Sequence, residues 1–379
     1  MTGDVFDVAI VGAGIIGLAH AMAAARRGKR VVVFDRDAQA NGASVRNFGF
    51  ITVSGQEAGD CWEKARRSCD IWQDIAAAAR IPILQRGLVI AAHYPESEAL
   101  IDAFLASEMG AGCRKIGCDE ARRSVPPLRA DIRVALYSPH EIRVESRTAI
   151  GQLSAFLAER HGVTFRFGEA VREVVSGRVV TAKNVTEAEA IIVCPGDDTT
   201  TLFPDRMAEY GVTRCKLQMM RFAPASPVTL QTAVMSDLGL ARYRGYADLP
   251  EATRLKARMD AERNEARVNG VHLIVTQSAD GTLVVGDSHH YAPTPDPFGR
   301  SAIDELILDE FDRILELPGR RVIGNWIGTY ASADGRWRFT DTPLEGVRLV
   351  VVTAGCGAST SFAIGEETIA DLFGTQAGA

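Results

Sequence analysis

The chain has 379 residues, of which 46% are hydrophobic and 24% are charged, a balance typical of a soluble globular protein with two domains or one large interleaved pair. Its net charge of −6 is mild and argues against nucleic acid or an acidic membrane as the main partner. The seven cysteines are odd in number and scattered without a Cys-x-x-Cys pair, so we expect a cytoplasmic protein with no zinc site.

The first patterned segment spans residues 7–35. An apolar run at 8–11, typical of a buried parallel strand, leads into Gly-x-Gly-x-x-Gly. These glycines allow a tight turn, a close approach of backbone to a pyrophosphate, and close packing of the following helix, expected over 15–27. A second strand over 30–34 ends in an acid that can bond both ribose hydroxyls. The pattern predicts a dinucleotide site containing Gly12, Gly14, Ile15, Ile16, Gly17, Asp35 and Arg36.

Residues 8–25 are apolar enough to suggest a membrane anchor as an alternative. Three glycines interrupt this run, however, and Asp7 precedes it. The basic residues follow the run, whereas a signal peptide carries them before it. No other apolar run is long enough to span a bilayer, so we expect no membrane segment.

A loop is expected over residues 41–51, which read Asn-Gly-Ala-Ser-Val-Arg-Asn-Phe-Gly-Phe-Ile. The loop closely follows the ribose acid, so it returns to the cofactor. Its small residues and backbone donors can hold a pyrophosphate or the edge of a cofactor ring. A plain surface loop is the alternative, but Arg46, Phe48 and Phe50 in so short a segment favour a functional role.

The middle of the chain predicts alternating elements. We expect a polar loop over 138–145 and a buried strand over 188–193 that ends in Cys194-Pro-Gly-Asp, where an α/β sheet presents its ligand edge. The other helices are expected at 57–80, 96–107 and 146–160, and the other strands at 87–92, 132–137, 163–167, 171–175 and 179–182.

After Cys215 the strands become mixed in polarity, which predicts a second domain built on an antiparallel sheet. Strands are expected at 216–222, 232–235, 272–276 and 282–286, the last two joined as a hairpin by Asp280-Gly281, with a charged helix over 250–267. The hairpin ends in a polar cluster, residues 287–291, that favours a site over isolated structural residues. Metal binding is the weaker interpretation, because the adjacent histidines of a strand point to opposite faces.

The C-terminal part repeats the strand, glycine turn and helix order. A helix is expected over 301–315, then a buried strand over 349–354, the turn Gly355-Cys-Gly-Ala-Ser-Thr-Ser-Phe, and a helix over 363–373. Backbone amides at the start of such a helix can meet a polarised carbonyl or an oxyanion. In this interpretation, two glycine turns far apart in sequence bind one extended ligand.

With these motifs the chain resembles the FAD-dependent oxidoreductases of the D-amino-acid oxidase superfamily, in the glycine oxidase and sarcosine oxidase group. The matching segments are 12–35, 44–49, 191–196 and 350–362. The resemblance implies an α/β fold in which a Rossmann-type FAD-binding domain is interleaved with an α+β substrate domain built on an antiparallel sheet. It implies the FAD-binding domain at 1–85, 140–214 and 325–379, and the substrate domain at 86–139 and 215–324. The further FAD contacts that it implies are Ala43, Ser44, Asn47, Phe48, Gly49, Val171, Cys194, Gly196, Gly355, Cys356, Gly357, Ser359, Thr360, Ser361 and Phe362.

The sequence departs from this group in the segment Trp326-Ile-Gly-Thr-Tyr-Ala-Ser-Ala-Asp-Gly. Family members often carry an arginine there that clamps the amino-acid carboxylate, and Tyr330 stands roughly in its place. An ordinary α-amino acid is therefore a weaker candidate substrate. The segment also lacks a cysteine that would tether the flavin, so we expect non-covalent FAD.

Three segments, 46–49, 241–246 and 278–290, most resemble a branch associated with phosphonate breakdown. That resemblance implies oxidation of 2-aminoethylphosphonate or its N-methyl form by hydride transfer to flavin, giving an imine that hydrolyses to an aldehyde plus ammonia or methylamine. The expected substrate-binding residues are Arg46, Asn47, Arg242, Asp287 and Tyr330, with Arg244 and Arg336 as further candidates for the phosphonate. The side chains expected to tune amine protonation are His289, His290 and Tyr243.

Three alternatives stay open at this stage. One is a glycine- or sarcosine-type oxidase whose carboxylate clamp has moved. Another is an NAD-dependent dehydrogenase that uses only residues 12–35, and the last is a redox flavoprotein without turnover. In the enzyme interpretation, oxygen or another acceptor takes the electrons from the reduced flavin.

Overall fold

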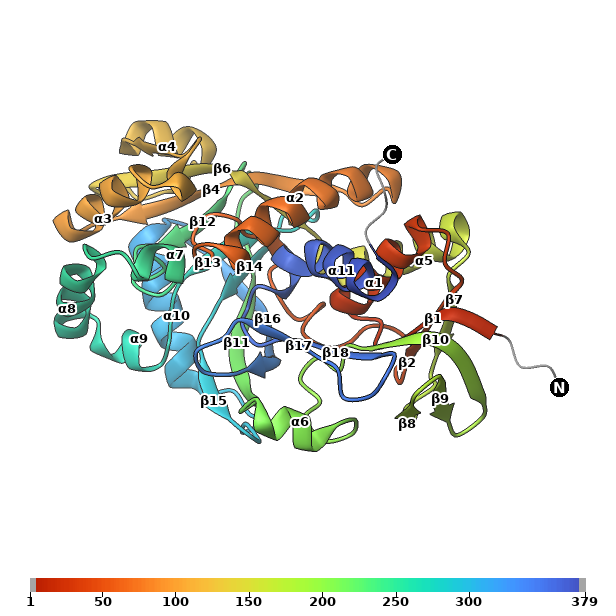
Figure 1. Ribbon diagram of the computed structural model, residues 1–379. Helices are drawn as coiled ribbons and strands as arrows, with labels where there is room; N and C mark the ends of the chain where they lie inside the picture. Colours follow the sequence, from red (N-terminus) through yellow and green to blue (C-terminus); the bar gives the residue numbers. More distant parts are fainter. Residues whose placement is uncertain (1–4, 375–379) are drawn as a thin grey trace.

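The computed structural model describes residues 5–374 and contains two β-sheets surrounded by helices (Figure 1). The first sheet has the spatial order β17-β18-β10-β1-β2-β7, with the hairpin β8-β9 attached to β10. Strands β18, β10, β1, β2 and β7 run parallel, so their carboxyl ends meet at one edge, where α/β sheets bind ligands. The members are β1 (Val5–Val11), β2 (Val31–Asp35), β7 (Thr164–Phe167), β8 (Val171–Val175), β9 (Arg178–Thr181), β10 (Val185–Val193), β17 (Arg338–Asp341) and β18 (Val347–Val352).

The helices that cover this sheet pack closely on each other. Helix α1 (Ile15–Arg26) follows the glycine turn directly and lies beside α11 (Gly357–Phe373) (Figure 1). This close approach depends on Gly365, because a Cβ there would lie 2.7 Å from the carbonyl oxygen of Ala19. Helix α5 (Ser146–His161) packs on α1, and α2 (Asp60–Ala78) packs on α11.

The second sheet has the order β15-β11-β14-β13-β12-β4-β6-β3, with β16 paired to β11 and β5 paired to β6. All its pairs are antiparallel except β12 with β4. The members are β3 (Phe50–Ile51), β4 (Ile83–Ala92), β5 (Arg114–Ile116), β6 (Val134–Val144), β11 (Thr213–Ala223), β12 (Ala233–Ser236), β13 (Ile274–Gln277), β14 (Leu283–Gly286), β15 (His290–Ala292) and β16 (Arg321–Ser332).

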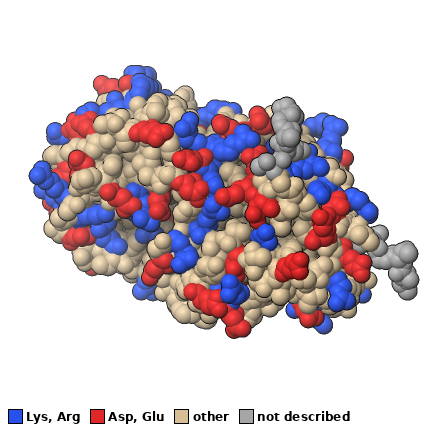
Figure 2. All heavy atoms as spheres, viewed as in Figure 1, with Lys and Arg blue, Asp and Glu red and all other residues tan. Residues whose placement is uncertain are grey.

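The remaining helices lie mostly around the second sheet, at the end of the molecule away from the chain termini (Figure 1). They are α3 (Pro95–Leu105), the 3-10 helix Glu108–Gly110, α4 (Cys118–Ser124), α6 (Pro204–Glu209), α7 (Arg244–Ala247), α8 (Ala252–Glu262), α9 (Asn264–Val268) and α10 (Ser301–Ile314). Acidic and basic side chains intermingle on the face shown in Figure 2, in keeping with the mild net charge. Within residues 5–374, no helix has both the length and the apolar character needed to cross a membrane.

The expected polar loop at 138–145 is wrong, because this segment continues strand β6 as far as Val144. Its charged residues Glu141 and Arg143 are fully buried and contact residues far away in the sequence. Glu141 accepts a hydrogen bond from the backbone N–H of Ser54 at 2.8 Å, and Arg143 donates one to the carbonyl of Phe48 at 3.1 Å. Distant partners of this kind leave no signal in the local pattern.

Two other expected helices differ from the structure, and one strand was not predicted. The charged helix over 250–267 is divided into α8 and α9 at Arg263. The segment after residue 324 forms the long strand β16, which pairs with β11 throughout. Helix α11 begins at Gly357, six residues earlier than expected, so residues 359–362 lie in its first turns.

The predicted division into two interleaved domains follows the two sheets only approximately. The boundary at residue 325 falls inside β16, and the boundary at 140 falls inside β6, both strands of the second sheet. Strand β3 also belongs to the second sheet, although it lies in the segment expected in the cofactor domain. The division remains a proposal, with its boundaries best drawn at the ends of these strands.

Candidate functional site

The glycine turn lies between β1 and α1, and its three glycines have different surroundings. Gly12 has φ +106°, and a Cβ there would lie 2.3 Å from the carbonyl oxygen of Cys194. A Cβ on Gly17 would lie 1.9 Å from the carbonyl oxygen of Gly12. Gly14 is different, because the only described atom within 4 Å of its Cβ position is Ser44 Oγ, at 3.1 Å. The turn therefore presents its backbone to a cavity, as pyrophosphate binding requires.

The 41–49 loop returns to this turn, as predicted. The Ser44 hydroxyl accepts a hydrogen bond from the N–H of Ile15 at 2.9 Å, at the start of α1. Asn47 fixes the loop locally, since its side-chain amide donates to the carbonyl of Ala43 and accepts from the N–H of Gly49, both at 2.6 Å. The loop is thus held in one conformation against the helix that it faces.

Two connected cavities run along the carboxyl edge of the first sheet. The outer one is lined by predicted cofactor residues from the ribose end, namely Gly12, Gly14, Asp35, Arg36, Ala43, Ser44, Val171, Cys194 and Gly196. The inner one shares several of these residues and extends to Ile15, Ile16, Gly17, Asn47, Phe48, Gly355 and Gly357. Their joint shape suits one extended ligand, with its pyrophosphate at the glycine turn and a ring system between the loop and the start of α11.

Six predicted cofactor residues line neither of these two cavities. Gly49, the last residue of the loop, lies against strand β6, where a Cβ would meet the carbonyl oxygen of Val144 at 1.8 Å. Because α11 starts early, residues 359–362 lie within the helix, and their side chains contact protein groups: the Ser359 hydroxyl bonds Thr52, and the Thr360 hydroxyl donates to the carbonyl of Cys356. The ring of Phe362 packs edge-on against Trp72 with centroids 5.1 Å apart. The six residues are Gly49, Cys356, Ser359, Thr360, Ser361 and Phe362.

The Asp35 carboxylate is placed by backbone contacts at the ribose end. It accepts hydrogen bonds from the N–H of Ala13 at 2.7 Å and the N–H of Asp37 at 2.9 Å. These bonds hold the side chain at the cavity wall. This position is compatible with the predicted contact between Asp35 and a ribose, which stays a prediction.

The inner cavity continues away from the glycine turn into a third cavity, which we call the substrate-side cavity. Both are lined by Tyr243, His272, His289 and Tyr330, while Asp287 lines the inner one. The substrate-side cavity also contains Arg242, Arg244, Arg336 and Cys356. The segments at 242–244, 287–289 and 330 are therefore brought together as predicted, whereas Arg46 and Asn47 line the inner cavity at its other end.

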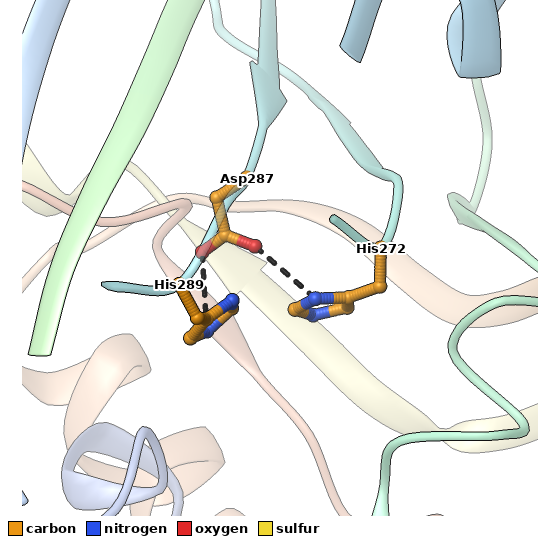
Figure 3. A group of neighbouring side chains, drawn as sticks. All are labelled: His272, Asp287 and His289. Atoms are coloured by element: carbon orange, nitrogen blue, oxygen red, sulfur yellow. Dashed lines mark ion pairs between the residues drawn. The ribbon is translucent and has the colours of Figure 1, made fainter. Parts of the chain in front are cut away.

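His272 was not predicted as a site residue, although it belongs to the group shown in Figure 3, in which Asp287 lies between His272 and His289. Its Nδ1 lies 3.4 Å from Asp287 Oδ1, and His289 Nε2 lies 3.9 Å from Asp287 Oδ2. His290, predicted as catalytic, is turned the other way, with its Nε2 in contact with Asn269 and Arg300. Alternation along the strand explains why one of the two neighbouring histidines reaches the cavity and the other does not.

Burial dominates the electrostatics of this group. It raises the pKa of Asp287 to about 8 and lowers the pKa of His272 and His289 well below the usual histidine range. The positive charge of Arg242 acts in the opposite sense on the Asp287 pKa and lowers both histidine pKa values further. At neutral pH all three side chains are therefore mostly uncharged.

We expect Gly14→Ala to weaken FAD binding by at least about tenfold, equal to about 1.4 kcal/mol, because its methyl group would occupy the surface that a pyrophosphate approaches. Titration of the apoprotein with FAD, followed by flavin fluorescence, measures this loss. Gly151→Ala is the control, since nothing described lies within 4 Å of that Cβ position in α5. Wild-type affinity in Gly14→Ala would contradict the assigned pyrophosphate position.

Solved structures share this fold over nearly their whole length. Glycine oxidase from Geobacillus kaustophilus is 19% identical, with a TM-score of 0.75 over 97% of this chain and 94% of that chain. Iminodiacetate oxidase from Chelativorans sp. BNC1 is 20% identical, with a TM-score of 0.73 over 98% and 96%. L-α-glycerophosphate oxidase from Mycoplasma pneumoniae, solved with FAD bound, is 15% identical, with a TM-score of 0.73 over 97% and 95%. No curated protein matches the sequence significantly.

The sequence itself matches the family model DAO, described as FAD dependent oxidoreductase, over residues 7–372. This match favours FAD over the NAD alternative. The glycine turn, the 41–49 loop and the start of α11 together form a cradle whose shape fits such a dinucleotide. The chain belongs to the DAO family of FAD-dependent oxidoreductases and is an enzyme that uses FAD.

Proposed function

We propose that this enzyme oxidises the C–N bond of a small primary or secondary amine that carries a phosphonate group, such as 2-aminoethylphosphonate or its N-methyl form. The main support for the proposal is that the Arg242 guanidinium is available to bind an anion. This half-buried side chain lines the substrate-side cavity, and no carboxylate of the described residues lies within ion-pair distance of it. Its guanidinium donates one hydrogen bond, to the hydroxyl of Tyr291 at 2.9 Å.

The other arginines of the cavity are less available for an anion. Arg244 is exposed and already forms ion pairs with Glu57 at 2.8 Å and Asp248 at 3.0 Å. Arg336 is exposed, with its guanidinium 5.2 Å above the ring of Tyr210. An arginine fork with free donors matches the oxygens of a phosphonate, so Arg242 is the principal anion-binding residue and the other two strengthen the local positive potential.

The amine end of the substrate fits the adjoining inner cavity. When bound, FAD supplies the acceptor for the hydride that leaves the carbon next to nitrogen. Asp287, His272 and His289 face the inner cavity from the second sheet, so they meet the amine when Arg242 holds the anion. The rings of Tyr243 and Tyr330 form the walls between them and limit access of water. The imine product then hydrolyses to an aldehyde and ammonia or methylamine.

The test is anaerobic bleaching of the flavin absorbance by a panel of amines. We expect 2-aminoethylphosphonate or its N-methyl form to reduce the flavin, and glycine, sarcosine and D-alanine at equal concentration to reduce it at least about tenfold more slowly. Repeating the reaction in air, with detection of hydrogen peroxide, identifies oxygen or another compound as the electron acceptor. Reduction by glycine or sarcosine with no response to the phosphonates would overturn the proposed substrate class.

A glycine- or sarcosine-type oxidase is the second candidate, because the free guanidinium of Arg242 also fits a carboxylate. Tyr330 lines the cavity where family members often carry the clamping arginine, so in this case Arg242 would be the relocated clamp. The same panel separates the two candidates. If no amine bleached the flavin, the redox flavoprotein without turnover would be favoured instead.

A further inference from the structure

The group of His272, Asp287 and His289 contains hydrogen-bonding atoms that have no partner among the described residues. Their exposed fractions are 2%, 4% and 8%, yet both ring nitrogens of His272 and Oδ1 of Asp287 have no hydrogen-bond partner among the described residues. Native proteins rarely leave buried polar atoms unpaired, and such atoms mark places where another molecule binds. All three residues line the inner cavity, and their side chains point toward one another (Figure 3).

Two kinds of ligand have the right chemistry for this group, a metal ion and a proton donor. The donor atoms lie within 4.8 Å of one another, a spacing compatible with an ion. However, the guanidinium charge of Arg242 acts on all three side chains, and it opposes two further positive charges at the same place. A group that exchanges one proton changes the local charge by only one, so the surroundings favour proton transfer over metal binding.

The geometry also fixes the roles of the three side chains. His289 Nδ1 lies 2.9 Å from the carbonyl oxygen of Gly270, an acceptor, so this nitrogen carries the proton and Nε2 faces Asp287 as an acceptor. The backbone N–H of Asp287 donates to the carbonyl of His272 at 3.1 Å, which holds the two side chains on one side of the hairpin. The carboxyl group is thus the member of the group that gains and loses a proton.

We propose that Asp287 accepts the proton of the substrate ammonium, with His272 and His289 flanking its carboxyl group at 3.4 and 3.9 Å. This inference rests on the proposed amine substrate. In the step, an N–H bond of the ammonium breaks and an O–H bond forms on the Asp287 carboxylate. The electron pair of that N–H bond stays on nitrogen. The neutral amine that results has the lone pair from which a C=N bond forms when the hydride leaves the carbon.

The other groups that face Asp287 keep a constant charge around neutral pH. Arg242 stays positive. Burial raises the pKa of Tyr243 and Tyr330 and raises that of Cys215 to about 11, so these three stay neutral. Asp287, with a pKa of about 8, is the group of this set that changes charge. Its carboxylate fraction rises from about 10% at pH 7 to about 90% at pH 9.

The experiment compares the FAD-loaded wild type with Asp287→Asn from pH 6 to pH 9.5. For the wild type we expect the rate constant of anaerobic flavin reduction, at low substrate concentration, to rise about tenfold between pH 7 and pH 9 with a midpoint near 8. In Asp287→Asn the midpoint should disappear, and at pH 9 the rate constant should fall at least about 100-fold. Asp309→Asn, an exposed position on α10, is the matched control and should keep the wild-type profile.

A second readout does not depend on turnover. Infrared difference spectra of the substrate-free holoenzyme should show a carboxylic-acid C=O band at pH 6 that is lost at pH 9.5 and is absent from Asp287→Asn. If no amine reduces the flavin, the proposed function fails, while this band still decides whether Asp287 binds a proton in that pH range. The inference would be overturned if the wild type lacked this band or if Asp287→Asn kept the midpoint near pH 8. It would also be overturned if metal analysis found one equivalent of metal in the wild type and none in His272→Ala.

Discussion

Replacing Arg242 by alanine is expected to lower the rate constant for flavin reduction by 2-aminoethylphosphonate, at low substrate concentration, by about 100- to 1,000-fold. Removing one partner of a desolvated charge pair costs about 3–4 kcal/mol, and each 1.4 kcal/mol is a factor of ten. Arg242 is free of carboxylate partners in the described structure, so its loss removes the main positive charge available to a phosphonate. Stopped-flow reduction under anaerobic conditions measures the effect.

The same variant needs a comparison that separates anion binding from other effects, because the charge of Arg242 also acts on the nearby histidines. Ethylamine provides it, since this amine has no anionic group. Arg242 also lowers the pKa of Asp287, so the comparison is made at pH 9.5, where the Asp287 carboxyl group is mostly ionised. There we expect Arg242→Ala to change reduction by ethylamine less than about threefold, and Arg242→Lys to lose part of the phosphonate rate because lysine lacks the fork geometry. Equal losses for both substrates would show that Arg242 does not bind the anion.

Arg244→Ala is the matched variant within the same cavity. Its guanidinium is exposed and already paired with Glu57 and Asp248. Because exposed ion pairs contribute little free energy, Arg244 should add little to binding of the phosphonate. We expect a loss of no more than about fivefold for the phosphonate substrate. A larger loss than in Arg242→Ala would move the anion site to the mouth of the cavity.

The sequence predicted the strand, glycine turn and helix because their determinants are local. The apolar run, three glycines and the acid at Asp35 lie within one short segment, and Gly12 and Gly17 have the predicted steric roles, while the pyrophosphate contact of Gly14 stays a prediction. Sequence order also located the 41–49 loop beside that turn, which the bond between Ser44 and Ile15 confirms. The family match over residues 7–372 confirms the identification of FAD that the resemblance implied.

The substrate side was predicted only in part, because its residues meet through long-range strand pairing. His272 has no local motif, and it reaches Asp287 only because β13 and β14 pair with Ile274 opposite Gly286. The hairpin predicted around Asp280-Gly281 contained this information, since extending its pairing by two residues places His272 beside the polar cluster. Strand β16 was missed as a strand for a similar reason, as its exposed, mixed sequence is held by pairing with β11.

The second large effect is expected at Arg143, whose side chain is fully buried beneath the 41–49 loop. Its guanidinium donates to the carbonyl of Phe48 at 3.1 Å, to Glu145 at 3.2 Å and to the hydroxyl of Ser278 at 3.2 Å. It therefore joins the loop at the cofactor cavity to strand β6 and to the β13–β14 hairpin. Burial lowers its pKa, and Glu145 offsets part of that effect, as expected for a charge retained by its partners.

We expect Arg143→Met to lower the free energy of unfolding by about 3–5 kcal/mol, because it leaves the Glu145 carboxylate without its partner and the Phe48 carbonyl with only the Thr276 hydroxyl, at 3.2 Å. The FAD affinity should fall as well, since Phe48 and Asn47 line the inner cavity. Urea unfolding of the FAD-saturated protein and FAD titration of the apoprotein measure the two losses. Arg114→Met is the control, because its exposed pair with Glu120 contributes no more than about 1 kcal/mol. If both variants lost the same small amount, the buried arginine would not anchor the loop, and the cradle would depend on the glycine turn alone.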